Sequence, residues 1–213
     1  MKTIAVVISN GWAVKEYLLS DFLTALASCA RVVLLSPLGE DPGFRRRFEG
    51  ENVVVETMNV PPLSRIGREV EELLKVAHFH RHPSVMGRLD MAFRDQKYKH
   101  ARVPVRRMLK LRVVRPVTQF VARSVFTHLT IEQQLLIEKL AYLSLRKESR
   151  RLAQVLERHG VDLLFSTMPV VAYFDRPAVW AARRSGIPAA CIVPGWDNLH
   201  SKGRLPVCFT HVL

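Results

Sequence analysis

Residues 3–9 read TIAVVIS, a continuous apolar and β-branched run that is typical of a strand buried on both faces of a parallel sheet. We expect it to be the central strand. Asn10 and Gly11 break the run, and residues 13–27 then carry apolar side chains at steps of four, as in an amphipathic helix. These side chains are Val14, Leu18, Phe22 and Leu26. Strand, tight turn and helix in this order predict the start of a Rossmann-like domain.

The same alternation continues on both sides of a long central stretch. Buried strands are predicted at 31–36 (RVVLLS), 52–57 (NVVVET), 161–167 (VDLLFST) and 187–193 (IPAACIV), with one more beginning in 206–213. Residues 37–50 are expected to be a loop. A helix is predicted over 175–184, with Asp175 as its N-cap and Gly186 after its end. The connections favour right-handed crossovers, so the predicted fold class is α/β with a Rossmann-like parallel sheet.

The central stretch, about residues 61–158, loses the strand pattern and is predicted to be helical. Helices are expected at 64–77 and 116–126, followed by a long one that starts near Thr130. Thr130 and Gln133 form a capping-box pattern, and His159-Gly160 supplies the end signal. We therefore expect one Rossmann-like domain over 1–213 that carries a helical, basic insertion.

Composition limits the classes of function. The chain has 213 residues, of which 48% are apolar and 24% charged, and this excludes wholesale disorder. Thirty-two Lys and Arg against 19 Asp and Glu give a net charge of +13, which indicates an anionic partner. Three cysteines without a CxxC pair favour a reducing cytosol, and no run of about 18 apolar residues occurs. We expect a cytoplasmic protein that attaches to the inner face of the membrane.

The charge is concentrated in residues 94–115, where nine Lys and Arg stand against Asp95, a local charge of +8. Apolar residues alternate with the basic ones, which suits contact with an anionic membrane, a lipid phosphate or a phosphorylated acceptor. The candidate contact residues are Arg106, Arg107, Lys110 and Arg112. A solvated basic face and RNA binding are the alternatives, although few aromatic residues are available for base stacking.

Two further sets of residues are candidates for ligand binding. Asn10, Gly11 and Trp12 lie between the first strand and a helix, where α/β sheets bind polar ligands, so they are candidate substrate-binding residues. They could equally be turn formers and a packed indole. Neither GxGxxG nor GxxxxGK[ST] occurs, and we expect no cofactor.

His78, His80 and His82 would share one face of a strand and offer three imidazoles to a metal. Arg81 opposes a dication, so we expect a basic loop and no metal site.

The loop after the strand at 187–193 has the most varied chemistry in the chain. Candidate substrate-binding residues here are Trp196, Asn198, Ser201, Lys202 and Gly203. Asp197 and His200 are the candidate catalytic residues, as a carboxylate and an imidazole able to act as a base. An Asx turn with a solvated lysine is the structural alternative. We expect this loop at the same sheet edge as Asn10 and Gly11.

The segment Gly-Trp-Asp-Asn-Leu-His-Ser-Lys-Gly at 195–203 resembles the Ser-Trp-Asp-Asn-x-Thr-Ser-Lys-Gly signature of bacterial surface-carbohydrate and capsule biosynthesis proteins of the GT-B glycosyltransferase type. Gly195 and His200 depart from it, which removes two hydroxyls. Residues 158–167 and 186–188 also look like the N-terminal half of a GT-B enzyme, whereas the basic middle matches no family.

The resemblance implies that this chain is the acceptor-side domain, working by metal-independent transfer from a nucleotide-sugar donor to a lipid-linked or polysaccharide acceptor. The donor-binding domain would follow Leu213, so we expect either a truncated product or a partner subunit that supplies it. Sugar-nucleotide 2-epimerases and polyol-phosphate transferases share this architecture and remain alternatives. A module binding acidic membrane or nucleic acid is the non-enzymatic alternative.

Overall fold

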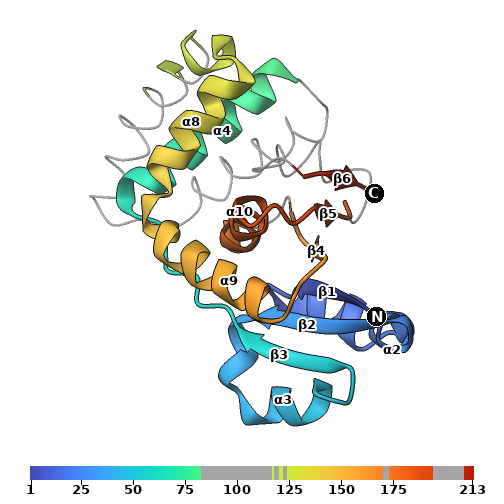
Figure 1. The fold of residues 1–213 in the computed structure, drawn as a ribbon. Coiled ribbons are helices and arrows are strands. Elements are labelled where there is room, and N and C mark those ends of the chain that lie inside the picture. Colours follow the sequence, from blue (N-terminus) through green and yellow to red (C-terminus); the bar gives the residue numbers. More distant parts are fainter. Residues whose placement is uncertain (83–116, 118–119, 122–123, 170–172, 194–208) are drawn as a thin grey trace, which may run out of the picture. The chain divides into compact units, whose positions relative to one another are not determined.

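The structure, a computed structural model, describes residues 1–82, 117, 120–121, 124–169, 173–193 and 209–213 (Figure 1). The chain divides into two compact units. Unit 1 comprises Met1–Pro62, Ser144–Pro194 and Leu205–Leu213, and unit 2 comprises Leu63–Leu143 and Gly195–Arg204. The helical insertion expected at about 61–158 thus contains the Leu63–Leu143 part of unit 2, while its last helix belongs to unit 1.

Unit 1 contains an all-parallel sheet, which confirms the predicted α/β, Rossmann-like fold class. Its strands are β1 (Lys2–Val7), β2 (Ala30–Ser36), β3 (Val53–Thr57), β4 (Leu163–Ser166), β5 (Ala189–Cys191) and β6 (His211–Val212). Their order in the described part of the sheet is β3-β2-β1-β4-β5-β6. The first strand is central, as predicted, because Val7 pairs with Leu35 of β2 on one side and with Ser166 of β4 on the other.

Helices cover both faces of this sheet. Ala5 and Val7 pack with Leu152 and Leu156 of α9 (Arg146–Arg158) and with residues of α10 (Arg176–Arg184). Val6 and Ile8 point the other way, because alternate side chains of a strand face opposite sides. They pack with residues of η1 (Val14–Leu18), α2 (Asp21–Cys29) and α3 (Pro42–Phe48). Burial on both faces explains the uninterrupted apolar character of the strands.

The helix predicted over 13–27 is broken into shorter elements. The chain forms α1 (Gly11–Ala13), η1 and then α2, and Ser20 lies at the break. Its hydroxyl donates to the Glu16 carbonyl at 2.6 Å and accepts from the Phe22 amide at 3.3 Å, so it closes one helix and caps the next. The predicted apolar face nevertheless packs onto the sheet at all four positions.

The loop expected over 37–50 contains two helices, η2 (Pro37–Glu40) and α3. The Asp41 carboxylate accepts from the Phe44 amide at 2.8 Å, and Pro42 occupies the first turn, where its missing amide hydrogen costs nothing. Gly39 lies so close to β3 that a Cβ there would come within 2.6 Å of the Thr57 Cα. Only glycine allows this approach.

The single long helix expected from Thr130 is also two helices, α8 (Ile131–Ala141) and α9, joined by η5 (Leu143–Leu145). Its predicted start is confirmed, because Thr130 and Gln133 make both bonds of a capping box. The predicted ends at Gly160 and Gly186 are confirmed as well, with φ of 60° and 69°. The break between α8 and α9 coincides with the boundary between the units.

Unit 2 is helical in its described part. Its first helix is α4 (Arg65–Arg81), capped by Ser64, and it packs against α8 and η4 (Phe126–His128). A guanidinium nitrogen of Arg81 donates to the Leu129 carbonyl at 3.2 Å, which joins the end of α4 to the start of α8. Among the described residues, no helix is both long and apolar enough to cross a membrane.

Candidate functional site

The carboxyl ends of β1 and β4 lie side by side in the middle of the sheet. From β1 the chain proceeds through α1 and α2 to β2 on one side, and from β4 it proceeds through α10 to β5 on the other. The two connections also cover opposite faces of the sheet. Such a topological switch point is where open α/β sheets bind their ligands, because the diverging connections leave a crevice above the strand ends.

Buried polar side chains gather at this switch point. Ser9, Ser166, Thr167 and Asp175 are each at least 93% buried. The Thr167 hydroxyl donates to the carbonyl of Val7 at 2.6 Å and so links the end of β4 to the end of β1. Buried polar groups are costly unless they bond one another, so this cluster is a specific feature of the sheet edge.

Asp175 is the centre of the cluster. One carboxyl oxygen, Oδ2, accepts from the Ser166 hydroxyl at 2.5 Å and from the Met168 amide at 3.4 Å. Its other oxygen, Oδ1, and the Ser9 hydroxyl are both buried, and neither has a hydrogen-bond partner among the described residues. The Ser9 hydroxyl lies near this carboxyl and lowers the pKa of Asp175 as a hydrogen-bonding neighbour would, although the geometry does not reach that of a full hydrogen bond.

The structure corrects the predicted role of Asp175 as a side-chain cap. Asp175 occupies the N-cap position of α10, but its side chain makes no bond to the helix amides. Its backbone is already helical, with φ −76° and ψ −19°, because the short helix η6 (Tyr173–Asp175) leads directly into α10. Pro177 also removes one of the amide donors that a cap would use. The carboxyl therefore turns inward, to Ser166.

Burial sets the protonation of this cluster. Removal from water raises the pKa of Asp175 above 3.8, and the contacts with Ser166, Ser9 and Met168 oppose that rise only in part. Cys191 pairs in register with Ser166, and burial together with the nearby Asp175 raises the pKa of its thiol to about 11. The thiol therefore stays protonated at neutral pH and is not a nucleophile.

The residues predicted from the first turn border the same strand end. The side-chain oxygen of Asn10 accepts from the Ala13 amide at 2.9 Å and so caps α1, which is the turn-forming role left open by the sequence. Trp12 is 43% exposed and meets Tyr17 edge to face, with 6.3 Å between ring centroids. A Cβ added at Gly11 would meet nothing within 4 Å. Ligand binding by Asn10, Gly11 and Trp12 stays a prediction.

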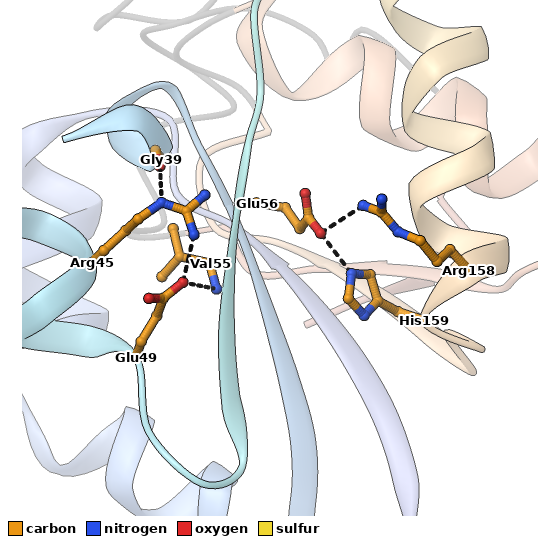
Figure 2. Close-up of polar contacts among 7 residues, drawn as sticks. All are labelled: Gly39, Arg45, Glu49, Val55, Glu56, Arg158 and His159. Atoms are coloured by element: carbon orange, nitrogen blue, oxygen red, sulfur yellow. Dashed lines mark hydrogen bonds and ion pairs between the residues drawn. The ribbon is translucent and has the colours of Figure 1, made fainter. Parts of the chain in front are cut away.

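A second polar cluster fastens β3 to its neighbours (Figure 2). Glu56 of β3 bonds Arg158 and His159, each at 2.7 Å, at the end of α9. Glu49 accepts from Arg45 at 2.6 Å and from the Val55 amide at 3.3 Å, which joins α3 to β3. Arg45 also donates to the Gly39 carbonyl. Because these groups bond one another and join secondary-structure elements, we assign them to the fold.

The basic loop predicted around the three histidines is wrong, and they do not lie in a strand either, because they belong to a helix. His78 and His80 belong to α4, and His82 is its C-cap. Residues two apart on a helix point in nearly opposite directions, so the three imidazoles do not share a face. The rings of His78 and His82, four residues apart, have centroids 5.1 Å apart. Within the described ranges, no three His, Cys, Asp or Glu side chains are placed to hold a metal ion.

Two sets of predicted residues lie outside the described ranges: the loop candidates from Trp196 to Gly203 and the basic candidates Arg106, Arg107, Lys110 and Arg112. Conversely, sequence reasoning missed Ser9, Ser166, Thr167 and Asp175 as a cluster. The available signal was the polar residue at or just after each of two buried strands, together with an aspartate ahead of a helix. No protein-family model, curated protein or solved structure matches this chain.

Proposed function

We propose that this chain is the acceptor-side domain of a nucleotide-sugar-dependent glycosyltransferase of the GT-B type, serving cell-surface polysaccharide or glycolipid synthesis. The observation that carries the proposal is the buried hydroxyl and carboxyl cluster at the switch point of an all-parallel sheet. The resemblance of residues 195–203 to the capsule-biosynthesis signature supports it.

A sugar acceptor suits this edge chemically. Sugars are rich in hydroxyls, so they are recognised by polar groups held in place on rigid elements. Asn10 and Trp12 follow β1 directly, and the bond from Thr167 to Val7 fixes the neighbouring strand end. In this proposal, Trp196, Asn198, Ser201, Lys202 and Gly203 also bind the acceptor, and Asp197 or His200 acts as the base.

In this proposal the nucleotide-sugar donor binds to another domain. A nucleotide-sugar needs a cradle for its diphosphate, and neither of the common glycine-rich phosphate motifs occurs in this sequence. In this proposal a C-terminal domain or a partner subunit supplies that site, and this chain alone should not catalyse transfer. No cofactor or metal is required. Anionic acceptors or lipid headgroups are the proposed partners of the basic segment at 94–115.

Gly11 offers a direct test, because a side chain there points into open space and its backbone needs no positive φ. We expect Gly11→Leu to fold normally and to block the switch-point edge. Gly50→Leu is the matched control, since Gly50 is equally open but precedes β3, at the opposite end of the strands. Saturation-transfer NMR with oligosaccharides, glycosyl phosphates and nucleotide-sugars should show acceptor-type ligands bound by the wild-type chain and by Gly50→Leu only.

Two results would contradict the proposal. Equal acceptor signals from Gly11→Leu and wild type would place binding elsewhere. Binding of nucleotide-sugars at this edge, without acceptor binding, would favour a sugar-nucleotide epimerase of the same architecture.

A further inference from the structure

Strand β3 forms one edge of the described part of the sheet, where β2 is its only neighbouring strand (Figure 1). Just after β3, the Met58 amide donates to the Ser36 carbonyl of β2 at 2.9 Å. Backbone groups alternate in direction along a strand, so those of Val53, Val55 and Thr57 point away from β2. A row of such groups at a sheet edge is a template for another strand.

The sequence of this edge favours pairing. Residues 53–55 are three consecutive valines, and β-branched side chains have a high strand propensity. A second copy of the chain carries the same edge, and two copies of one strand can pair antiparallel about a two-fold axis. Val55 is the middle residue of β3, so in full register the two Val55 residues would exchange N–H···O bonds.

The chain closes both ends of this edge itself. The Val53 amide donates to the Gly50 carbonyl at 3.2 Å, and the Gly50 amide donates back to the Val53 carbonyl at 3.0 Å. At the other end, the guanidinium of Arg151 in α9 donates to the Thr57 carbonyl. These bonds occupy groups that a second strand would need, so the middle of the edge decides whether a strand can add.

One carboxylate closes the middle of the edge. Glu49 Oε1 accepts from the Val55 amide at 3.3 Å and from a guanidinium nitrogen of Arg45 at 2.6 Å (Figure 2). Arg45 is itself held, because its Nε donates to the Gly39 carbonyl at 2.5 Å. Glu49 is the C-cap of α3, so this helix and Arg45 together place the carboxylate against the edge. A strand that added here would have to displace Glu49, and a second copy would bring its own Glu49 to the same place.

We propose that the edge of β3 is a latent pairing surface for a second copy of this chain, and that the bond from the Val55 amide to Glu49 keeps it closed. Arg45 positions the carboxylate for this bond. Besides joining α3 to β3, Glu49 thus prevents self-association through the sheet. The inference does not depend on the proposed sugar transfer, because it uses only the bonds along β3.

Sedimentation velocity of the full chain at rising concentration measures the self-association. Glu49→Ala leaves the Val55 amide without its acceptor, so we expect an association constant about tenfold or more above that of the wild type. Glu49→Gln keeps a carbonyl oxygen for the Val55 amide and for Arg45, and its association should equal that of the wild type. Circular dichroism shows that each variant is folded.

Asp41→Ala is the matched control. The Asp41 carboxylate accepts from the Phe44 amide at 2.8 Å and caps the start of α3, so this variant loses the same charge and loosens the same helix. It leaves the bond between Glu49 and Val55 in place, and its association should equal that of the wild type.

Hydrogen exchange of the Val55 amide, followed by NMR, shows whether the association uses β3. In dilute Glu49→Ala this amide should exchange faster than in the wild type, and rising concentration should slow it again as two strands pair. In Asp41→Ala its exchange should not depend on concentration.

The proposal is wrong if Glu49→Ala and the wild type associate equally, or if Glu49→Gln associates as strongly as Glu49→Ala. Equal association of Glu49→Ala and Asp41→Ala would also overturn it, because a loosened α3 would then be the cause. Association of Glu49→Ala that does not slow exchange of the Val55 amide would overturn it as well, since another surface of the chain would then be in contact.

Discussion

Replacing Asp175 by alanine and by asparagine separates the hydrogen bonds of this carboxyl from its charge. Alanine removes the bonds to the Ser166 hydroxyl and the Met168 amide, each contributing about 1 kcal/mol. It also leaves the fully buried Ser166 hydroxyl without its acceptor, at a cost of about 1–3 kcal/mol. Removing the carboxyl also removes the cost of keeping it buried, and this offsets part of the loss. We expect Asp175→Ala to lower the free energy of unfolding by about 2–4 kcal/mol.

Asparagine keeps a carbonyl oxygen for Ser166 and Met168 and is uncharged at every pH. In the wild type, the folded-state pKa of Asp175 is raised above 3.8, so folding takes up a proton at pH values between the unfolded and folded pKa. The stability that this proton contributes is fully present below the unfolded pKa and is lost as pH rises through the folded pKa. Wild type should therefore lose about 1.4 kcal/mol per pH unit relative to Asp175→Asn within that window.

Urea unfolding followed by circular dichroism, from about pH 4 to about pH 8, measures this difference. Asp162→Asn, followed from about pH 5 down to about pH 2, is the control of opposite sign. A hydrogen bond from Lys2 lowers the pKa of Asp162, so its contribution is present above the unfolded pKa of 3.8 and is lost as pH falls through the folded pKa. Parallel pH profiles for wild type and Asp175→Asn would refute the raised pKa. An alanine variant as stable as wild type would refute the role of the carboxyl in joining the strand ends.

Glu148→Ala should lower the free energy of unfolding by about 3 kcal/mol, because the buried carboxylate binds Arg151 through both oxygens and accepts from the Asn59 amide. Thermal melting measures this loss, and a variant with the melting temperature of the wild type would show that these bonds do not stabilise the fold. Gly160→Ala and Gly186→Ala should each cost about 1 kcal/mol in denaturant unfolding, since both glycines have positive φ, whereas Gly11→Ala should be tolerated. Nucleotide-sugars should leave the melting temperature of this chain unchanged, and a shift of several degrees would place the donor site here. In the glycosyltransferase that we propose, Asp197→Asn and Lys202→Ala should each reduce turnover about tenfold or more, and wild-type rates in both would remove them from the proposed site.

The strands could be predicted because the residues that specify each strand are neighbours in the sequence. TIAVVIS at 3–9 and RVVLLS at 31–36 are apolar throughout, and only a strand covered on both faces buries such runs completely. The helix ends at Gly160 and Gly186 were predictable for the same reason, since a left-handed residue after a helix requires little more than a glycine.

Helix breaks were harder to predict, because apolar periodicity continues through them. Val14, Leu18, Phe22 and Leu26 keep one face although Ser20 interrupts the helix, so the spacing alone indicates a single element. The break becomes visible only when the Ser20 hydroxyl is seen bonded to the Glu16 carbonyl and the Phe22 amide. Similarly, Thr130 marked the start of α8, but not its separation from α9.

By itself the sequence determined the parallel α/β sheet and the strand ends at which a ligand site would form, since both follow from apolar runs and the polar residues after them. It did not determine the role of Asp175, because an aspartate ahead of a helix ordinarily caps it. Tertiary structure decided that role: pairing of β1 with β4 places Ser9 beside Ser166 and Thr167, residues more than 150 positions apart in the chain. In that buried setting the carboxyl bonds Ser166, because leaving the hydroxyl without a partner would cost more than leaving the helix uncapped.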